Sequence, residues 1–125
     1  MSADHTTAKG RAAEDLAAQH LASLGYQVLE RNVRSPLGEL DIVARDGGDL
    51  VFVEVRSRGD DDRGRAEETV GHVKQRQLAR VAEAYLEERG LCPPTCRFDV
   101  IAVNGDELTL YRDAFRPGLD EIGRL

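Results

Sequence analysis

Hydrophobic positions near the N-terminus recur at helical spacing. They are Ala13, Leu16, Ala17, Leu21 and Leu24. Spacings of three and four residues place such side chains on one face of a helix. The pattern therefore predicts a helix that is capped by Thr6 or Thr7 and runs to about Leu24. Gly25 follows at the position where a helix C-terminus favours glycine.

Strand patterns occupy the next part of the chain. Tyr26 to Val33 alternates between apolar and polar residues, and Ser35-Pro36-Leu37-Gly38 is typical of a turn. Glu39 to Arg45 and Leu50 to Arg58 are rich in Val, Ile and Phe. The Asp46-Gly47-Gly48-Asp49 segment between them predicts a hairpin.

The second half of the chain predicts one long helix and two more strands. The helix spans about Ala66 to Arg89, after a glycine- and aspartate-rich loop at 59–64. Its apolar stripe consists of Val70, Val73, Leu78, Val81, Tyr85 and Leu86. Strands at Arg97 to Val103 and Glu107 to Tyr111 are joined at Asn104-Gly105. The order α-β-β-β-α-β-β predicts a mixed α/β domain, with a central sheet flanked by helices.

Pairing the first hairpin symmetrically about Gly47-Gly48 gives each strand an apolar face and a partly charged face. The apolar face comprises Leu40, Ile42, Ala44, Val51, Val53 and Val55, and we expect it to be core. On the other face, Asp41 lies opposite Glu54, and Glu39 lies opposite Arg56. Two opposed carboxylates repel each other unless one is protonated or a cation lies between them. Mg²⁺ prefers such oxygen ligands.

Structural explanations of these charges remain open at this point. Glu39 and Arg56 are placed to form a cross-strand ion pair, and Asp41 has Arg45 or Arg97 as candidate partners. A register slip of one residue would also move every side chain to the opposite face. The hairpin alone therefore leaves a metal site and a purely structural role as alternatives.

Composition narrows the protein class. A chain of 125 residues with 41% apolar residues fits one domain, predicted at 9–115 with a disordered N-terminus at 1–8 and a C-terminal tail at 116–125. No apolar stretch is long enough to span a membrane, and the two cysteines are too few for a secreted disulfide scaffold. We expect a cytoplasmic protein. The net charge of −6 argues against DNA binding through a broadly basic surface, but it permits a local basic groove.

Several segments together resemble the YraN-like uncharacterised protein family (family 0102). They are Gly38-Glu39-Leu40-Asp41-Ile42, Phe52-Val53-Glu54-Val55-Arg56-Ser57-Arg58, Gly25-Tyr26, Arg31-Asn32, Ala84-Tyr85-Leu86 and Arg97-Phe98-Asp99-Val100, with Gly10, Glu14, Ala17, Leu21, Gly64 and Lys74. The resemblance covers about residues 9 to 115. That family looks like a member of the restriction-endonuclease-like superfamily, whose relatives include Holliday-junction resolvases.

The resemblance implies a metal-dependent endonuclease that hydrolyses phosphodiester bonds of DNA, branched or structured DNA included. Asp41, Glu54 and Glu14 would bind Mg²⁺ or Mn²⁺, and Arg56 would stand where the superfamily has lysine. Arginine is always charged, so it can stabilise a phosphate but is a poor general base. Resolvases act as dimers, so the resemblance also implies a homodimer by analogy.

The same resemblance suggests a set of residues for nucleic-acid binding: Arg56, Arg58, Lys74 and Gln77. Lys74 lies on the inward stripe of its helix, so it could supply the missing cation or simply snorkel at the core edge. Glu14 has a structural alternative, because a glutamate in the first turns of a helix interacts favourably with the helix dipole. Two other functions remain open: a nucleic-acid-binding module that has lost catalysis, and an acidic protein-interaction domain.

Overall fold

The predicted order of helices and strands is confirmed in the computed structural model, which describes residues 8–57, 70–93 and 95–116. The elements are α1 (Ala8–Ser23), β1 (Gln27–Ser35), β2 (Gly38–Asp46), β3 (Asp49–Ser57), α2 (His72–Arg89), β4 (Thr95–Asn104) and β5 (Glu107–Phe115). The predicted loop at 59–64, Arg58 and both termini lie outside the described residues. Within the described ranges, no helix is long and apolar enough to cross a membrane.

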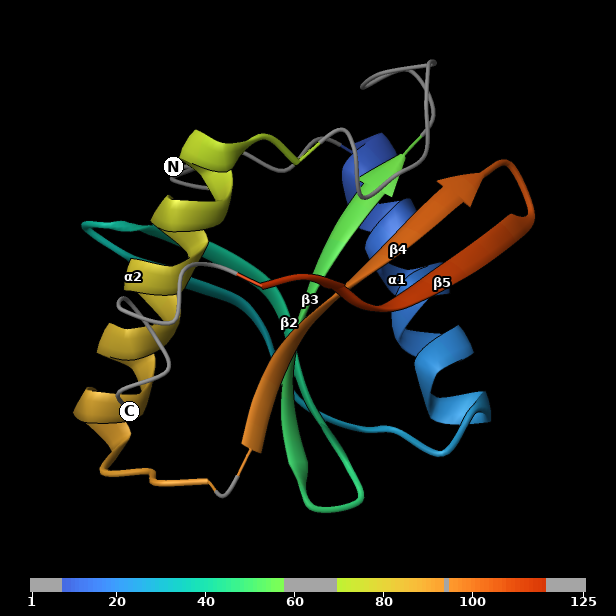
Figure 1. Cartoon of the computed structure of the whole chain (residues 1–125). Coiled ribbons are helices and arrows are strands. Elements are labelled where there is room, and N and C mark those ends of the chain that lie inside the picture. The colour runs from blue at the N-terminus through green and yellow to red at the C-terminus, as the bar shows by residue number, and fades with distance from the viewer. Residues whose placement is uncertain (1–7, 58–69, 94, 117–125) are drawn as a thin grey trace.

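The five strands form one mixed sheet in the order β1-β2-β3-β4-β5. All neighbours are antiparallel except β3 and β4, which are parallel. Parallel neighbours need a crossover connection, and α2 lies in that connection. Figure 1 shows the sheet between α1 and α2, which cover its opposite faces.

Two apolar clusters hold these three layers together. One lies between the sheet and α2 and is centred on Phe52, Phe98 and Tyr85. The other lies between the sheet and α1 and includes Leu21, Ile42 and Val53. Burial of both sheet faces explains why β3 and β4 are almost continuously apolar rather than alternating.

The structure corrects the predicted start of the second helix. Val70 and Gly71 are not helical, and α2 begins at His72 with Gly71 as its N-cap. The inward stripe runs through Leu78, Val81, Tyr85 and Leu86 as predicted, and Val70 is buried ahead of the helix. The prediction that Val73 belongs to the inward stripe is wrong, because Val73 is 75% exposed. Counting back by four from Leu78, the stripe passes through Lys74 instead.

A second correction concerns the predicted apolar face of the first hairpin. Ile42 and Ala44 pack on the α1 side as expected, but Leu40 packs on the α2 side with Val43. Pairing between β2 and β3 reaches only as far as Ile42 and Val53. The tip of the β1–β2 hairpin instead docks on α2, where the Gln77 amide donates to Leu37 O at 3.0 Å.

Gly38 makes this docking possible. It has a φ of +148°, and a Cβ added there would lie 3.0 Å from both Gln77 Nε2 and Val81 Cγ2. Only glycine combines this conformation with such a close approach. The hairpin is thereby held against α2, which brings the start of β2 and the start of α2 to the same end of the sheet.

Candidate functional site

The site lies where β2 and β3 separate. The predicted register is confirmed from Asp46·Asp49 to Ile42·Val53. The next opposed pair would be Asp41 and Glu54, and there the backbone pairing stops. The Asp41 side chain replaces the backbone as the acceptor at this level, since its Oδ2 accepts a hydrogen bond from Val55 N at 2.9 Å. Asp41 thus sits in the gap between the two strands.

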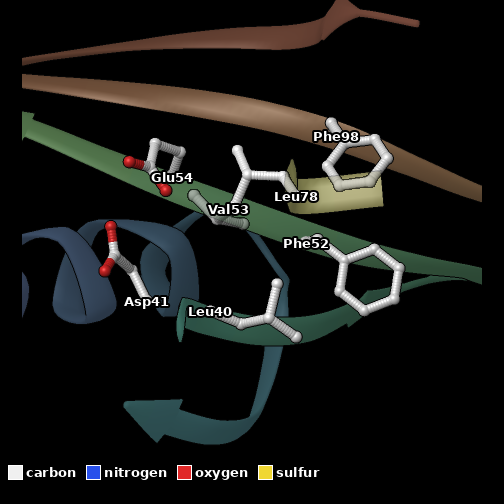
Figure 2. Close-up of a pocket in the computed structure, with 7 residues that line it drawn as sticks. All are labelled: Leu40, Asp41, Phe52, Val53, Glu54, Leu78 and Phe98. Atoms are coloured by element: carbon white, nitrogen blue, oxygen red, sulfur yellow. The ribbon is translucent and has the colours of Figure 1, made fainter. Parts of the chain in front are cut away.

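Glu54 faces α2 from the other side of this gap. It is only 7% exposed, and its Oε2 lies 3.1 Å from Lys74 Nζ. Figure 2 shows the Asp41 and Glu54 carboxylates beside each other at one end of a small pocket. The pocket has a volume of about 10 Å³, room for about one water molecule. The rest of its lining is apolar: Leu40, Phe52, Val53, Leu78 and Phe98.

This environment strongly favours the protonated form of Asp41. Burial, followed by the negative charge of Glu54, raises the pKa of Asp41 to about 8. Glu14 and Glu39 raise it further, whereas the hydrogen bond from Val55 N opposes the shift. Four carboxylates therefore act on one another here, and Asp41 is at their centre.

Glu14 reaches the site from α1. Because α1 is described from Ala8, Glu14 lies beyond its first turn, where the helix dipole has little effect. The side chain is buried, with 6% exposure, and its Oε1 is 3.7 Å from Arg31 Nη2. Burial raises the pKa of Glu14, while a hydrogen bond with Asn32 and the charge of Arg31 lower it.

Four buried polar atoms among the described residues lack a hydrogen-bond partner, and each is carried by one of the elements that supply the acidic residues or their neighbours. Within the described ranges they are Glu14 Oε1, Asn32 Oδ1, Glu39 Oε2 and Arg56 Nε. Buried polar groups are normally satisfied, and each exception needs an explanation. Three of these atoms are acceptors and the fourth is a donor. Glu14 Oε1 and Glu39 Oε2 have an arginine nitrogen at 3.7 and 3.6 Å, which is an ion-pair distance but too long for a hydrogen bond.

Sequence reasoning missed two residues of this cluster. The sequence predicts Glu39 as a candidate ion-pair partner of Arg56, but it lies across from Arg34, with Nε and Oε2 3.6 Å apart. Glu39 shares the strand face of Asp41 by its odd number, which was the available signal. Asn32 carried no such signal, because its proximity to Glu14 depends on how β1 packs against α1.

The other predicted binding residues differ in their positions. Arg56 is half-buried, and no ion pair or side-chain hydrogen bond within the described ranges involves it. Lys74 meets Glu54 as described above. Gln77 contacts the β1–β2 turn rather than the acidic cluster. Arg58 is outside the described residues, so its role stays a prediction.

A second charged cluster, the Arg97 cluster, lies at the closed end of the same hairpin. Arg97 donates to Asp99 Oδ1 at 2.9 Å, to Asp46 Oδ2 at 2.8 Å and to Asp49 Oδ2 at 2.6 Å. Asp99 is fully buried, and it also accepts from Tyr26 Oη at 2.7 Å and from the backbone N of residue 113 at 2.9 Å. The cluster is satisfied internally, which identifies it as structural.

The acidic cluster fits a hard divalent cation by the chemistry of its donors. Carboxylate and amide oxygens are the ligands that Mg²⁺ and Mn²⁺ prefer. In the part of the chain that the structure describes, no three His, Cys, Asp or Glu side chains are grouped closely enough to hold an ion together. The carboxylates act on Asp41 from several sides without converging on one point.

Comparisons with known proteins agree on one family. The model of the uncharacterised protein family UPF0102 matches residues 13–103. A UPF0102 protein of Syntrophotalea carbinolica is 52% identical over 100 residues, covering 78% of this chain and 81% of the relative. One from Dechloromonas aromatica is 45% identical over 112 residues, covering 90% and 92%. One from Persephonella marina is 41% identical over 107 residues, covering 86% and 92%.

Proposed function

The chain belongs to the uncharacterised protein family UPF0102, and we propose that it is a metal-dependent endonuclease that hydrolyses phosphodiester bonds of DNA. Branched or otherwise structured DNA is the proposed substrate class. The family name assigns no activity, so the proposal rests on the site.

The four unsatisfied buried atoms are the observation that carries this proposal. Glu14 Oε1, Asn32 Oδ1 and Glu39 Oε2 are acceptors, and a cation or its bound waters would complement them. Arg56 Nε is a donor and would complement an anionic oxygen. A divalent cation beside a phosphodiester supplies both complements. Because unsatisfied buried groups destabilise the fold, their presence on the elements that carry the acidic residues favours a functional explanation.

Asp41, Glu54 and Glu14 are the residues that would hold the metal. When bound, a divalent cation lowers the pKa of a water molecule and neutralises charge on the phosphate. The raised pKa of Asp41 indicates a shortage of positive charge at the site, since its carboxylate is buried and three other carboxylates act on it. A cation there would stabilise the ionised form of Asp41.

Arg56 and Lys74 would divide the tasks of the lysine that is usual in the superfamily. Arg56 holds a fixed positive charge and would bind the phosphate. Lys74 extends from α2 to Glu54, with Nζ and Oε2 3.1 Å apart. Its ammonium is the nearest flexible cation to the acidic cluster that the structure describes, and it would approach the scissile phosphate from the α2 side.

Calorimetric binding of Mg²⁺ and Mn²⁺ tests the proposal first. We expect the wild type to bind and the double variant Asp41→Asn, Glu54→Gln to lose binding. Asp49→Asn is the matched control, because it removes a carboxylate from the same hairpin at the satisfied end. If the wild type binds neither ion at millimolar concentration with DNA present, the proposal is wrong.

A cleavage screen on branched, duplex and single-stranded DNA then separates an active nuclease from a binding module without catalysis. The second function is favoured by one observation, the arginine at position 56. If the wild type binds metal and DNA but cuts none of these substrates, and Arg56→Lys does cut, the chain is a binding module. If the wild type cuts in a metal-dependent manner, it is the nuclease proposed.

A further inference from the structure

Asn32 lies where the β1–β2 hairpin changes faces. Arg31 pairs with Ile42, and Val33 pairs with Leu40, so the register places Asn32 opposite Asp41. In a regular ladder, pairs two residues apart share a face. Here Ile42 packs on the α1 side, whereas Val33 and Leu40 pack on the α2 side. The alternation breaks at the level of Asn32 and Asp41.

The backbone of Asn32 accounts for this break. Its φ is +54°, and apart from glycines only Asp113 shares such a conformation within the described ranges. L residues seldom adopt it, although asparagine does so more readily than most. Because of this conformation, Arg31 and Asn32 both reach Glu14, although neighbouring side chains of a regular strand point to opposite faces.

Only one of the two polar groups of the Asn32 side chain has a hydrogen-bond partner. Its amide hydrogen-bonds to the Glu14 carboxylate and favours the charged form, which identifies the NH₂ group as the donor. Its Oδ1 is then the remaining acceptor, and this atom is buried without a hydrogen-bond partner. Strained backbone and an unsatisfied acceptor thus coincide at one residue beside two carboxylates.

We propose that Asn32 belongs to the metal shell, with its NH₂ group holding Glu14 in place and its Oδ1 supplying a neutral oxygen to the cation. This inference rests on the proposed metal-dependent function and adds a residue to it. A neutral oxygen is suited to this position, because a fifth carboxylate would add to the mutual repulsion around Asp41.

The substitution Asn32→Gly tests the side chain without disturbing the backbone. Glycine adopts a φ of +54° without strain, so the variant loses only the amide. We expect Mg²⁺ affinity, measured by calorimetry, to fall by about 10- to 100-fold, as is usual when a supporting group of a metal site is removed. Asp113→Gly is the matched control: it has the same backbone conformation in β5, and we expect its affinity to equal that of the wild type.

A spectroscopic measurement gives a readout that does not depend on activity. The chain has two asparagines, Asn32 and Asn104, so protein labelled with ¹⁵N-asparagine shows two side-chain amides. We expect Mn²⁺ to broaden the Asn32 amide strongly at substoichiometric concentration. The Asn104 amide, exposed at the end of β4, should stay sharp.

The outcomes separate this inference from the function on which it rests. If the wild type binds metal and Asn32→Gly binds it equally well, with the Asn32 amide unbroadened, the Asn32 inference is wrong and the nuclease proposal stands. If the wild type binds no metal, both are wrong. A selective loss in Asn32→Gly, together with selective broadening of Asn32, supports both.

Discussion

The β2–β3 hairpin has two pairs of opposed acidic residues, and the two pairs differ in the cations that neutralise them. At the closed end, Asp46 and Asp49 face each other, and both accept hydrogen bonds from Arg97. At the open end, Lys74 is the one ion-pair partner of Asp41 and Glu54 within the described ranges, and its side chain is 45% exposed. The same residue types thus form a satisfied structural cluster at one end and an unsatisfied one at the other.

This difference teaches that the acidic residues alone do not identify a functional site. Both ends would repel a broadly anionic ligand, and both contain arginine nearby. Among the residues that the structure describes, the satisfied Arg97 cluster contributes no buried side-chain atom that lacks a hydrogen-bond partner, whereas Glu14 and Glu39, which act on Asp41, each contribute one. Sites that must bind a ligand are commonly destabilising without it, whereas structural clusters are satisfied within the fold.

The largest expected effect is at the closed end. Arg97→Met would leave the Asp99 carboxylate, which is fully buried, without its cation. Removing one partner of a buried ion pair costs about 3–5 kcal/mol in the free energy of unfolding. Urea denaturation measures this loss, and metal binding by the protein that remains folded should be unchanged. A loss below about 1 kcal/mol would mean that the cluster is not structural.

The open end should respond in the opposite direction. Burial and Glu54 raise the pKa of Asp41 to about 8, so the folded state binds this proton more tightly than the unfolded state, whose aspartate has a pKa near 3.8. Stability is therefore present at low pH and is lost as the pH rises from about 4 to about 8. One such group contributes up to about 1.4 kcal/mol per pH unit.

Asp41→Asn should remove this pH dependence. The amide oxygen can still accept from Val55 N, so we expect the free energy of unfolding of the metal-free variant to be clearly higher than that of the wild type at pH 8. The two proteins should have similar free energies of unfolding at pH 4. Urea denaturation at a series of pH values, in the presence of a chelator, measures both. Equal slopes for the two proteins would show that Asp41 is not the group responsible.

The smallest effects should come from the exposed cation at each end. Lys74→Met and Arg112→Met each remove a surface partner, and each should lower the free energy of unfolding by about 1 kcal/mol or less. Their functional effects should differ, because Lys74 contacts Glu54 and Arg112 contacts Asp46. DNA cleavage should fall in Lys74→Met and be retained in Arg112→Met. Equal cleavage by both variants would remove Lys74 from the site.

The sequence predicted the elements well because each depends on local signals. The hairpin register followed from Gly47-Gly48 and from the alternation of β2 and β3 residues, and it is confirmed as far as Ile42·Val53. The predicted start of α2 is too early. Val70 lies four positions before Lys74, so it continues the helical spacing of apolar residues although it is not itself helical. Val70 lies ahead of the helix and is buried in the apolar cluster on the α2 side.

By itself, the sequence determined the order of the elements, the confirmed part of the hairpin register and the family of the chain. Those features depend on periodicity, turn residues and motif spacing, all of which are local. Only the tertiary structure decided which charges are satisfied. Arg97 meets Asp46 because a parallel crossover places β4 beside β3, and Asn32 reaches Glu14 because the β1–β2 hairpin twists between two helices. Such contacts join residues distant in the chain, so no local pattern encodes them.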